Sequence, residues 1–310
     1  MSAFATLERM EEPHPAPPPS SGRQRGRLTP YLLLLPGMLW LALFFLVPMV
    51  FLVSQSLQTG SVEDGYSVTW AFSTYADAIS TYWVQFVRSF AYAFIATAAA
   101  LLIAYPLAYA IAFKAGKWKN VLLVLVIAPF FTSFLIRTLA WQTILQSDGI
   151  VVTVLDKLGI IQVLQWLQFI PNDQLIHSPV AVVTGLTYNF LPFMTLPLYA
   201  SLERLDPRLL EAGGDLYATP WTSFRKITFP LSLPGVVAGT LLTFIPAAGD
   251  YINSHLLGST KTTMIGQVID GQFLRVLNYP VAAALSVTLM ASIVVLVAVY
   301  IRRAGTEELV

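Results

Sequence analysis

Long apolar runs alternate with short charged segments along most of this chain. A helix needs about 20 consecutive apolar residues to cross the hydrocarbon core of a bilayer. The runs that meet this length are Tyr31 to Leu57, Ser89 to Phe113, Asn120 to Ile136 continuing past Arg137 to Gln146, Ser178 to Leu202, Leu231 to Gly249, and Val276 to Ile301. The pattern therefore predicts an all-α polytopic membrane protein in which residues 30–303 form six transmembrane helices.

Small residues recur within two of these runs. Alanines lie four residues apart from Ala96 to Ala112, and Gly235 and Gly239 form a G-x-x-x-G pair. Small side chains let two helices approach closely in a membrane, so both runs are expected to pack against neighbouring helices. For the alanines, the alternative is that this residue is simply frequent in membrane helices.

The longest charged interruption is residues 203–232, which we call the charged segment. Within it, Asp206 and Thr219 each precede a proline. A side-chain oxygen at the N-cap and a proline at the first helical position both favour a helix start. The charged segment is therefore expected to form two short helices joined by a turn near residues 217–219.

Apolar positions follow a helical spacing on both expected helices. They are Leu209, Leu210, Gly213 and Leu216 on the first helix and Trp221, Phe224 and Ile227 on the second. Between them lies Glu211-Ala212-Gly213-Gly214, where small residues let another backbone approach and the carboxylate can accept a hydrogen bond from an arginine. The charged segment is therefore expected to dock on a partner, and a generic amphipathic loop is the alternative.

The order Glu211-Ala212-Gly213, Tyr217 and Ile227-Thr228-Phe229-Pro230 resembles the EAA signature of permease subunits of binding-protein-dependent ABC importers, which have a MetI-like transmembrane domain. The signature is E-A-A, three residues, a glycine, nine residues and I-x-L-P, and this chain keeps the spacing. The resemblance implies a coupling-helix loop, between the fourth and fifth spans, that docks on a cytoplasmic ATPase. The residues implied for ATPase coupling are Glu211, Ala212, Gly213, Gly214, Tyr217, Ile227 and Pro230.

Three positions depart from this signature. Gly213 replaces the second alanine, Tyr217 the glycine and Phe229 the leucine. Tyr217 matters most, because a glycine takes a left-handed turn freely whereas a tyrosine takes it only at a cost in free energy.

The composition also indicates a membrane protein. The chain has 310 residues, of which 56% are apolar and 11% charged, whereas ordinary globular domains carry about 25% charged residues. It has no cysteine, so neither a disulfide framework nor a thiolate metal site is expected. The net charge of +1 indicates no particular partner, and no nucleic acid is expected.

Basic residues near the span ends indicate the orientation, because cytoplasmic loops carry an excess of Lys and Arg. With the N-terminus inside, the cytoplasmic segments hold Arg23, Arg25, Arg27, Lys114, Lys117, Lys119, Arg204, Arg208, Arg225, Lys226, Arg302 and Arg303, and the outer loops hold Arg88, Lys157, Lys261 and Arg275. Both termini and the charged segment are therefore expected in the cytoplasm. Residues 1–29 are Pro-rich without a signal-peptide pattern and are expected to be a disordered cytoplasmic tail, and residues 304–310 a second cytoplasmic tail.

Charged residues at membrane depth are candidates for function. Counted outward from the cytoplasm, Arg137 and Asp250 reach a similar depth near the outer ends of their spans. One interpretation is a mutual ion pair, Arg137 with Asp250, or simple exposure to outer water. The other is that Asp250 and the neighbouring Tyr251 meet a cationic substrate, the carboxylate compensating a desolvated amine and the ring adding a cation–π contact.

Four further residues are candidates for lining a substrate pathway. Trp141 lies one turn beyond Arg137, and Tyr105, Tyr188 and Asn189 lie near mid-span. The alternative is that the aromatic residues face lipid or pack in the core. No metal site is expected, because the outer histidines lack paired ligands.

Nothing in the sequence indicates catalysis by this chain. Residues 258–262 are similar to a phosphate-binding loop, but position 255, where its first glycine is required, is a histidine. The chain is therefore expected not to be an enzyme and to hold no cofactor. ATP and Mg are expected to bind to a partner subunit that hydrolyses ATP.

Further stretches resemble the spermidine/putrescine branch of these importers. They are residues 129–138 with Trp141, and residues 245–251 with 256–258 and 264–266. The resemblance implies polyamine import across the bacterial inner (plasma) membrane. Its implied partners are a second homologous permease forming a heterodimer, two copies of an ABC ATPase and an extracytoplasmic substrate-binding protein. Permeases for thiamine, phosphonate or iron(III) are similar and stay open as alternatives, as does, less favoured, a secondary transporter.

Overall fold

The structure is a computed structural model that describes residues 29–167, 169–170 and 174–304. The expected N-terminal tail, except for its last residue, and the expected C-terminal tail, except for its first, lie outside these residues. The described residues divide into two compact units, with the boundary between Phe51 and Leu52. Within residues 31–56, an apolar helix is long enough to cross a membrane. It comprises most of α1 (Thr29–Leu41), a π-helical turn (Ala42–Leu46) and α2 (Val47–Ser56).

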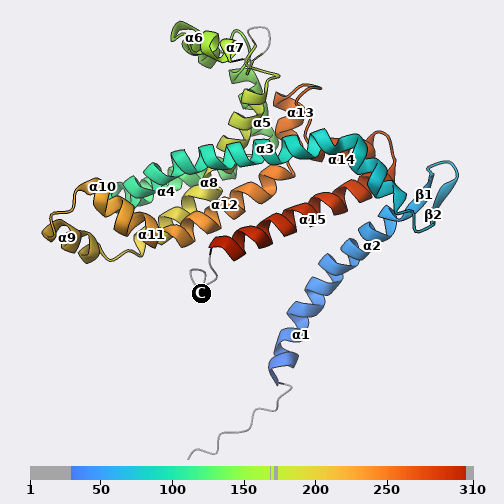
Figure 1. Cartoon of the computed structure of the whole chain (residues 1–310), viewed down its shortest axis with the longest axis horizontal. Helices are drawn as coiled ribbons and strands as arrows, with labels where there is room; N and C mark the ends of the chain where they lie inside the picture. Colours follow the sequence, from blue (N-terminus) through green and yellow to red (C-terminus); the bar gives the residue numbers. More distant parts are fainter. Residues whose placement is uncertain (1–28, 168, 171–173, 305–310) are drawn as a thin grey trace, which may run out of the picture. The chain divides into compact units, whose positions relative to one another are not determined.

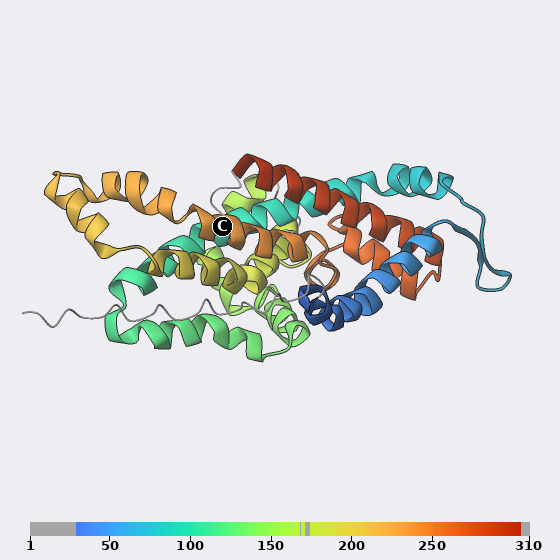
Figure 2. The same ribbon diagram turned by 90° about the horizontal axis from the view of Figure 1, so that it is seen from below.

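The second unit is built on three helices, α3 (Ser73–Tyr109), α8 (Pro179–Glu203) and α12 (Leu233–Ala248). They pack as a bundle in which each helix contacts the other two (Figures 1 and 2). The alanines of α3 that recur every four residues from Ala96 to Ala108 are fully buried. The small-residue face expected from the sequence is thus confirmed as a packing face.

Glycines set the contact between α12 and α8. A Cβ atom added at Gly239 would lie 3.0 Å from the carbonyl oxygen of Met194, and one added at Gly235 would lie 2.8 Å from that of Pro197. Real side chains essentially never approach a backbone this closely, so only glycine fits at either position. The G-x-x-x-G pair therefore brings the two helix backbones together as expected.

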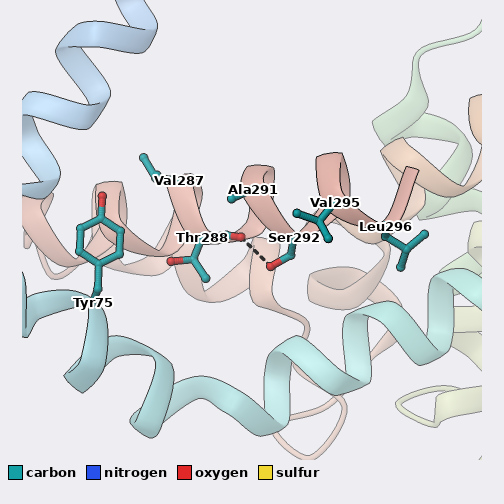
Figure 3. A pocket seen from close by; sticks show the side chains of 7 residues that line it. All are labelled: Tyr75, Val287, Thr288, Ala291, Ser292, Val295 and Leu296. Carbon is teal, nitrogen blue, oxygen red and sulfur yellow. Dashed lines mark hydrogen bonds between the residues drawn. The ribbon is translucent and has the colours of Figure 1, made fainter. Parts of the chain in front are cut away.

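Two C-terminal helices, α14 (Ile265–Leu274) and α15 (Tyr279–Ala304), cover α3. A groove of about 560 Å³ lies between Tyr75 of α3 and one face of α15 (Figure 3). On that face the Ser292 hydroxyl donates to the carbonyl oxygen of Thr288 at 2.7 Å. This is close to the usual length of about 2.8 Å for such a bond. The groove is otherwise largely apolar, so it offers a polar solute little to bind.

The chain bends sharply within the third expected span and again where the charged segment meets the fifth. Residues 116–131 and 134–144 meet at 95°, and residues 220–231 and 233–248 meet at 63°. By length and composition the described residues contain four helices able to cross a membrane, or six if each bent pair is one span. The fold is therefore helical and polytopic, but its third expected span is not straight.

The first bend replaces a continuous helix expected over residues 120–146. Here α4 (Lys119–Ile127) ends in a 3₁₀ turn that contains Pro129, and α5 (Phe134–Ile144) begins after extended backbone at residues 132 and 133. Proline lacks the N–H needed for a helical bond to the preceding turn, and extended residues interrupt the ladder. The helix that follows the first span also differs, since it begins at Ser73 rather than Ser89.

The remaining elements are short. They are β1 (Gln58–Ser61) paired antiparallel with β2 (Gly65–Val68), a π-helical turn (Ala110–Lys114), 3₁₀ turns (Gly116–Trp118 and Ala128–Phe131), α6 (Ile150–Lys157), α7 (Ile160–Trp166), α9 (Pro207–Asp215), α10 (Pro220–Ser223), a second π-helical turn (Phe224–Thr228), α11 (Phe229–Leu231) and α13 (Ile252–Leu257). Helices α9 and α10 lie at one end of the α3–α8–α12 bundle, and α14 lies at the other (Figures 1 and 2).

Candidate functional site

Local capping bonds start both helices of the charged segment. The Asp206 carboxylate accepts the N–H of Arg208 at 3.0 Å and begins α9. The Thr219 hydroxyl accepts the N–H of Thr222 at 3.3 Å and begins α10. Both helix starts expected from the sequence are therefore confirmed.

Tyr217 ends α9 in a left-handed conformation, with φ of 58°. Its N–H donates to the carbonyl oxygen of Gly214 at 2.9 Å, and the N–H of Ala218 donates to that of Gly213 at 3.1 Å. These two bonds form a Schellman motif, whose left-handed residue is usually glycine. The turn that a glycine would permit is thus present, and the tyrosine adopts it with its side chain 97% exposed.

The small residues of the charged segment divide into one buried and several exposed positions. Gly213 is buried, and a Cβ atom added there would lie 3.0 Å from Cδ1 of Ile227. Glu211, Ala212 and Gly214 are exposed. Gly213 and Ile227 therefore hold α9 against the following turn, while the other three face outward.

The charged segment also carries exposed apolar side chains. Leu216 is 81% exposed and Trp221 69% exposed, and Leu209 and Tyr217 are also exposed. Large apolar side chains gathered on a surface often mark a docking site. We call Leu209, Glu211, Leu216, Tyr217 and Trp221 the exposed patch.

The base of the charged segment is buried against α3. Tyr105 of α3 packs edge-on to Phe224 at 5.5 Å between ring centroids and lies 6.0 Å from the ring of Phe229. The Tyr105 hydroxyl lies 2.7 Å from the Ser232 hydroxyl oxygen. Pro230, between Phe229 and Ser232, is exposed on α11. Tyr105 therefore contacts the charged segment, not the residues around Asp250.

A second set of polar residues joins α5, α8 and α13, and we call it the polar cluster. Arg137 donates from Nε to Oδ1 of Asn189 at 2.9 Å and from Nη1 to the carbonyl oxygen of Pro129 at 2.6 Å. Asn189, which is 1% exposed, donates from Nδ2 to Thr138 at 3.2 Å and to Oδ1 of Asn253 at 3.0 Å. A single buried amide thus connects three helices.

Asp250 lies beside the polar cluster, just beyond the end of α12. Its Oδ1 accepts the N–H of Asn253 at 2.8 Å, which caps the first turn of α13. The Asp250 side chain is buried, and in this conformation its carboxylate is an internal acceptor.

The structure does not form a direct ion pair between Arg137 and Asp250. Among the described residues the ion pair is Lys119 with Glu203. The Arg137 guanidinium instead binds an amide and a carbonyl oxygen, and it lies 5.6 Å from the centre of the Phe134 ring. Neutral partners and an aromatic face satisfy this charge without a carboxylate.

The other pathway candidates are brought together only in part. Trp141 and Tyr188 pack edge-to-face at 5.3 Å between centroids, and Tyr251 is 44% exposed. Sequence reasoning missed the bridging roles of Thr138 and Asn253. The capping bond from the N–H of Asn253 to Asp250 could have been predicted, because an Asp three residues before a backbone N–H is a common helix-start pattern, but this pattern does not predict the side-chain bond to Asn189.

Comparison with known proteins gives consistent matches. Residues 104–304 match the family described as "Binding-protein-dependent transport system inner membrane component". The "Spermidine/putrescine transport system permease protein PotB" of Haemophilus influenzae is 35% identical over 264 residues, covering 85% of this chain and 90% of the relative. The protein of the same name from Escherichia coli is 36% identical over 264 residues, covering 85% and 93%.

A solved structure has the same fold. It is the crystal structure of a bacterial ABC transporter involved in the import of the acidic polysaccharide alginate. The match has a TM-score of 0.62 and 19% identity, and it covers 88% of this chain and 94% of that chain. Figure 1 therefore shows an arrangement of helices shared with a chain of an importer.

Proposed function

Because the chain belongs to the family of binding-protein-dependent transport system inner membrane components, we propose that it is the permease subunit of an ATP-driven polyamine importer. It is a multi-pass protein of the inner membrane. The polyamine assignment rests on the similarity to relatives named for spermidine and putrescine, which covers 85% of this chain. That likeness is long enough to include both the charged segment and the polar cluster.

The proposed topology has six spans in residues 30–303, with both tails, 1–29 and 304–310, and the charged segment in the cytoplasm. The ion pair between Lys119 and Glu203 supports it, because it joins the basic segment before α4 to the start of the charged segment. Both segments then lie on the side of the membrane where basic residues gather. The position of α14, at the end of the bundle away from α9 and α10, fits an outer location for residues 251–275.

An ABC ATPase is the proposed partner of the exposed patch. The patch combines a carboxylate at Glu211 with small residues at Ala212 and Gly214 and large apolar side chains beside them. A carboxylate can accept paired hydrogen bonds from an arginine, and the small residues allow close backbone approach. Gly213, Tyr217, Ile227 and Pro230 shape the turn that presents it.

The complete importer in this proposal has four kinds of subunit. This chain forms a heterodimer with a second homologous permease, two ATPase copies bind and hydrolyse ATP with Mg, and an extracytoplasmic protein delivers the substrate. The chain itself is not an enzyme and binds no cofactor. Movement of the docked ATPases then switches the permeases between inward- and outward-facing states, a two-state change that both ATP and the loaded binding protein bias.

Aromatic faces are the proposed contacts for the cationic substrate. Trp141 with Tyr188 and the exposed ring of Tyr251 each offer a π face to an amine. Asp250 supplies negative charge beside them, and Asn189 positions the neighbouring helices. Tyr105, buried against the charged segment, is not included in this pathway.

Uptake by the purified complex tests the proposal. The four kinds of subunit are reconstituted in proteoliposomes with ATP on the ATPase side, and labelled spermidine is added with the binding protein. ATP-dependent accumulation that putrescine competes is expected. A complex that hydrolyses ATP in response to its binding protein but accumulates thiamine, phosphonate or iron(III) instead of spermidine would contradict the polyamine assignment.

A further inference from the structure

The charged segment joins α12 at a bend that is centred on one buried serine. Residues 220–231 and 233–248 meet at 63°, and Ser232 between them is fully buried. Its hydroxyl donates to the carbonyl oxygen of Phe229 at 2.9 Å. The angle between the charged segment and α12 therefore depends on the surroundings of Ser232.

Tyr105 is the residue of α3 that reaches this bend. The Ser232 hydroxyl proton is already donated to Phe229, so the Tyr105 hydroxyl donates to Ser232 Oγ, at 2.7 Å. The tyrosine side chain is 9% exposed. One hydrogen bond thus ties the bend between the charged segment and α12 to a third element, α3.

Aromatic contacts continue this link to the exposed patch. Phe224 packs edge-on to Tyr105, and Trp221 stacks on Phe224 at 5.4 Å between centroids. Trp221 belongs to the exposed patch and is 69% exposed. A continuous run of packed rings therefore connects the surface of the charged segment to α3.

The end of α3 near Tyr105 is itself built to deform. Pro106 follows Tyr105 inside the helix, and the helix changes to a π-helical turn over Ala110–Lys114. Proline removes one backbone hydrogen bond, and π-helical turns are less regular than the α-helix and frequent at functional sites. Displacement of Tyr105 is therefore expected to bend α3 more easily here than in a regular helix.

We propose that Tyr105 is a positioning residue that latches the bend at Ser232, so that displacement of the charged segment is passed to α3 as well as α12. This inference rests on the proposed docking of an ATPase on the exposed patch. It assigns to Tyr105 a role in energy coupling in place of substrate contact. The packed rings and the hydrogen bond to Ser232 are the physical link between the charged segment and α3. Breaking this link is expected to weaken the coupling between ATP hydrolysis and transport.

Tyr105→Phe removes the hydrogen bond to Ser232 with little other change. It removes the donor to Ser232 but keeps the ring that packs on Phe224 and Phe229. Ser232 keeps its own bond to Phe229, so no buried donor is left without an acceptor. Tyr109→Phe is the matched control, because Tyr109 lies one turn further along α3 and packs on Phe113 at 4.9 Å.

The first measurement is the ratio of substrate transported to ATP hydrolysed in the reconstituted importer. For Tyr105→Phe we expect ATP hydrolysis to stay within about twofold while transport per ATP falls by about fivefold or more, a typical size for coupling between sites. Tyr109→Phe is expected to match the wild type. Equal ratios in all three proteins would overturn the latch while leaving the proposed function intact, and a wild-type complex without uptake would reject the proposed function itself.

The second measurement follows the link directly by spin-label distances. The chain has no cysteine, so Asp215→Cys on the charged segment and Leu102→Cys on α3 can be labelled, with partner subunits in cysteine-free form. Asp215 is exposed and lies outside the exposed patch, and Leu102 is 76% exposed.

With the latch intact, the two labels move together. The wild-type distance distribution is therefore expected to be narrow and the same without nucleotide and with ATP. In Tyr105→Phe it is expected to broaden or shift when ATP binds, while Tyr109→Phe behaves as the wild type. Identical distributions for Tyr105→Phe and the wild type in both states would overturn the proposal.

Discussion

The charged segment and the polar cluster contain similar polar residues in opposite settings. Glu211 in the charged segment is exposed, as are leucine and tryptophan side chains of the same segment. Asn189 in the polar cluster is buried and bonded to residues from two other helices. The Glu211 carboxylate is free to accept hydrogen bonds from another protein, whereas the Asn189 amide already bonds within the chain and holds α5, α8 and α13 together. Changes in the two regions are therefore expected to separate activity from stability.

The largest expected effect is on transport, from Glu211→Ala. A charge-assisted hydrogen bond to a partner contributes about 1.5–3 kcal/mol, so uptake is expected to fall by at least about tenfold. The thermal unfolding midpoint should not change, because the side chain is exposed. Uptake by the reconstituted complex and unfolding of the purified chain measure the two effects.

Asp215→Ala is the control for this variant, since Asp215 is also an exposed carboxylate of α9. Its uptake should stay within about twofold of the wild type, because Asp215 lies outside the exposed patch and an exposed substitution changes stability by under about 0.5 kcal/mol. An equal loss of uptake in both variants would show that docking depends on the negative charge of α9 in general and not on Glu211 in particular.

The largest expected effect on stability comes from Asn189→Leu. This change leaves Arg137 Nε and Asn253 Oδ1 without their amide partner. Unpaired buried groups of this kind cost about 1–3 kcal/mol, and more when charged. The unfolding midpoint in detergent micelles should fall clearly, whereas Asn120→Leu, at an exposed position of α4, should leave it unchanged. A stable Asn189→Leu protein would remove the structural role given to the polar cluster.

A pair of glycines sharpens the same comparison. A Cβ atom added at Gly185 would lie 2.4 Å from Cδ1 of Leu257 and 2.7 Å from Oδ1 of Asn253. Gly185→Ala is therefore expected to destabilise the protein by about 1–3 kcal/mol. Gly214→Ala, in the charged segment, meets open space among the described residues and should be neutral or slightly stabilising. Similar unfolding midpoints for both variants would contradict the packing described around α13.

The smallest effect is expected from Tyr217→Gly. Glycine accepts the left-handed conformation that costs a tyrosine about 1 kcal/mol. The N–H of Ala218, bonded to Gly213, should then exchange with solvent about fivefold more slowly. Ala218→Gly, which adds backbone freedom without relieving Tyr217, should not slow this exchange. Faster exchange in Tyr217→Gly would indicate that the tyrosine side chain stabilises the turn.

Features set by neighbours in sequence could be predicted. The capping residues Asp206 and Thr219 fix the starts of α9 and α10 within three residues. The left-handed conformation of Tyr217 depends only on hydrogen bonds to the last turn of α9. The alanine and glycine repeats depend only on helical spacing. Local rules therefore sufficed for the charged segment and the packing faces.

Features set by distant residues could not be predicted. Arg137 and Asn189 are 52 residues apart in the chain, and Tyr105 and Ser232 are 127 apart. Which buried partner satisfies a charge or a hydroxyl depends on how the helices pack, and no spacing rule contains that information. For this reason an ion pair with Asp250 stood as one interpretation of Arg137, whereas its guanidinium binds Asn189 and the carbonyl oxygen of Pro129. The bond between Tyr105 and Ser232 could not be predicted for the same reason.

Labelling of a cysteine at position 214 tests the central claim most directly. In the Gly214→Cys variant of this cysteine-free chain, a membrane-impermeant maleimide should react in inside-out vesicles, and bound ATPase should protect the site. The same reagent should leave intact spheroplasts unlabelled. Labelling from outside the spheroplasts would place the charged segment beyond the reach of an ATPase and contradict the account.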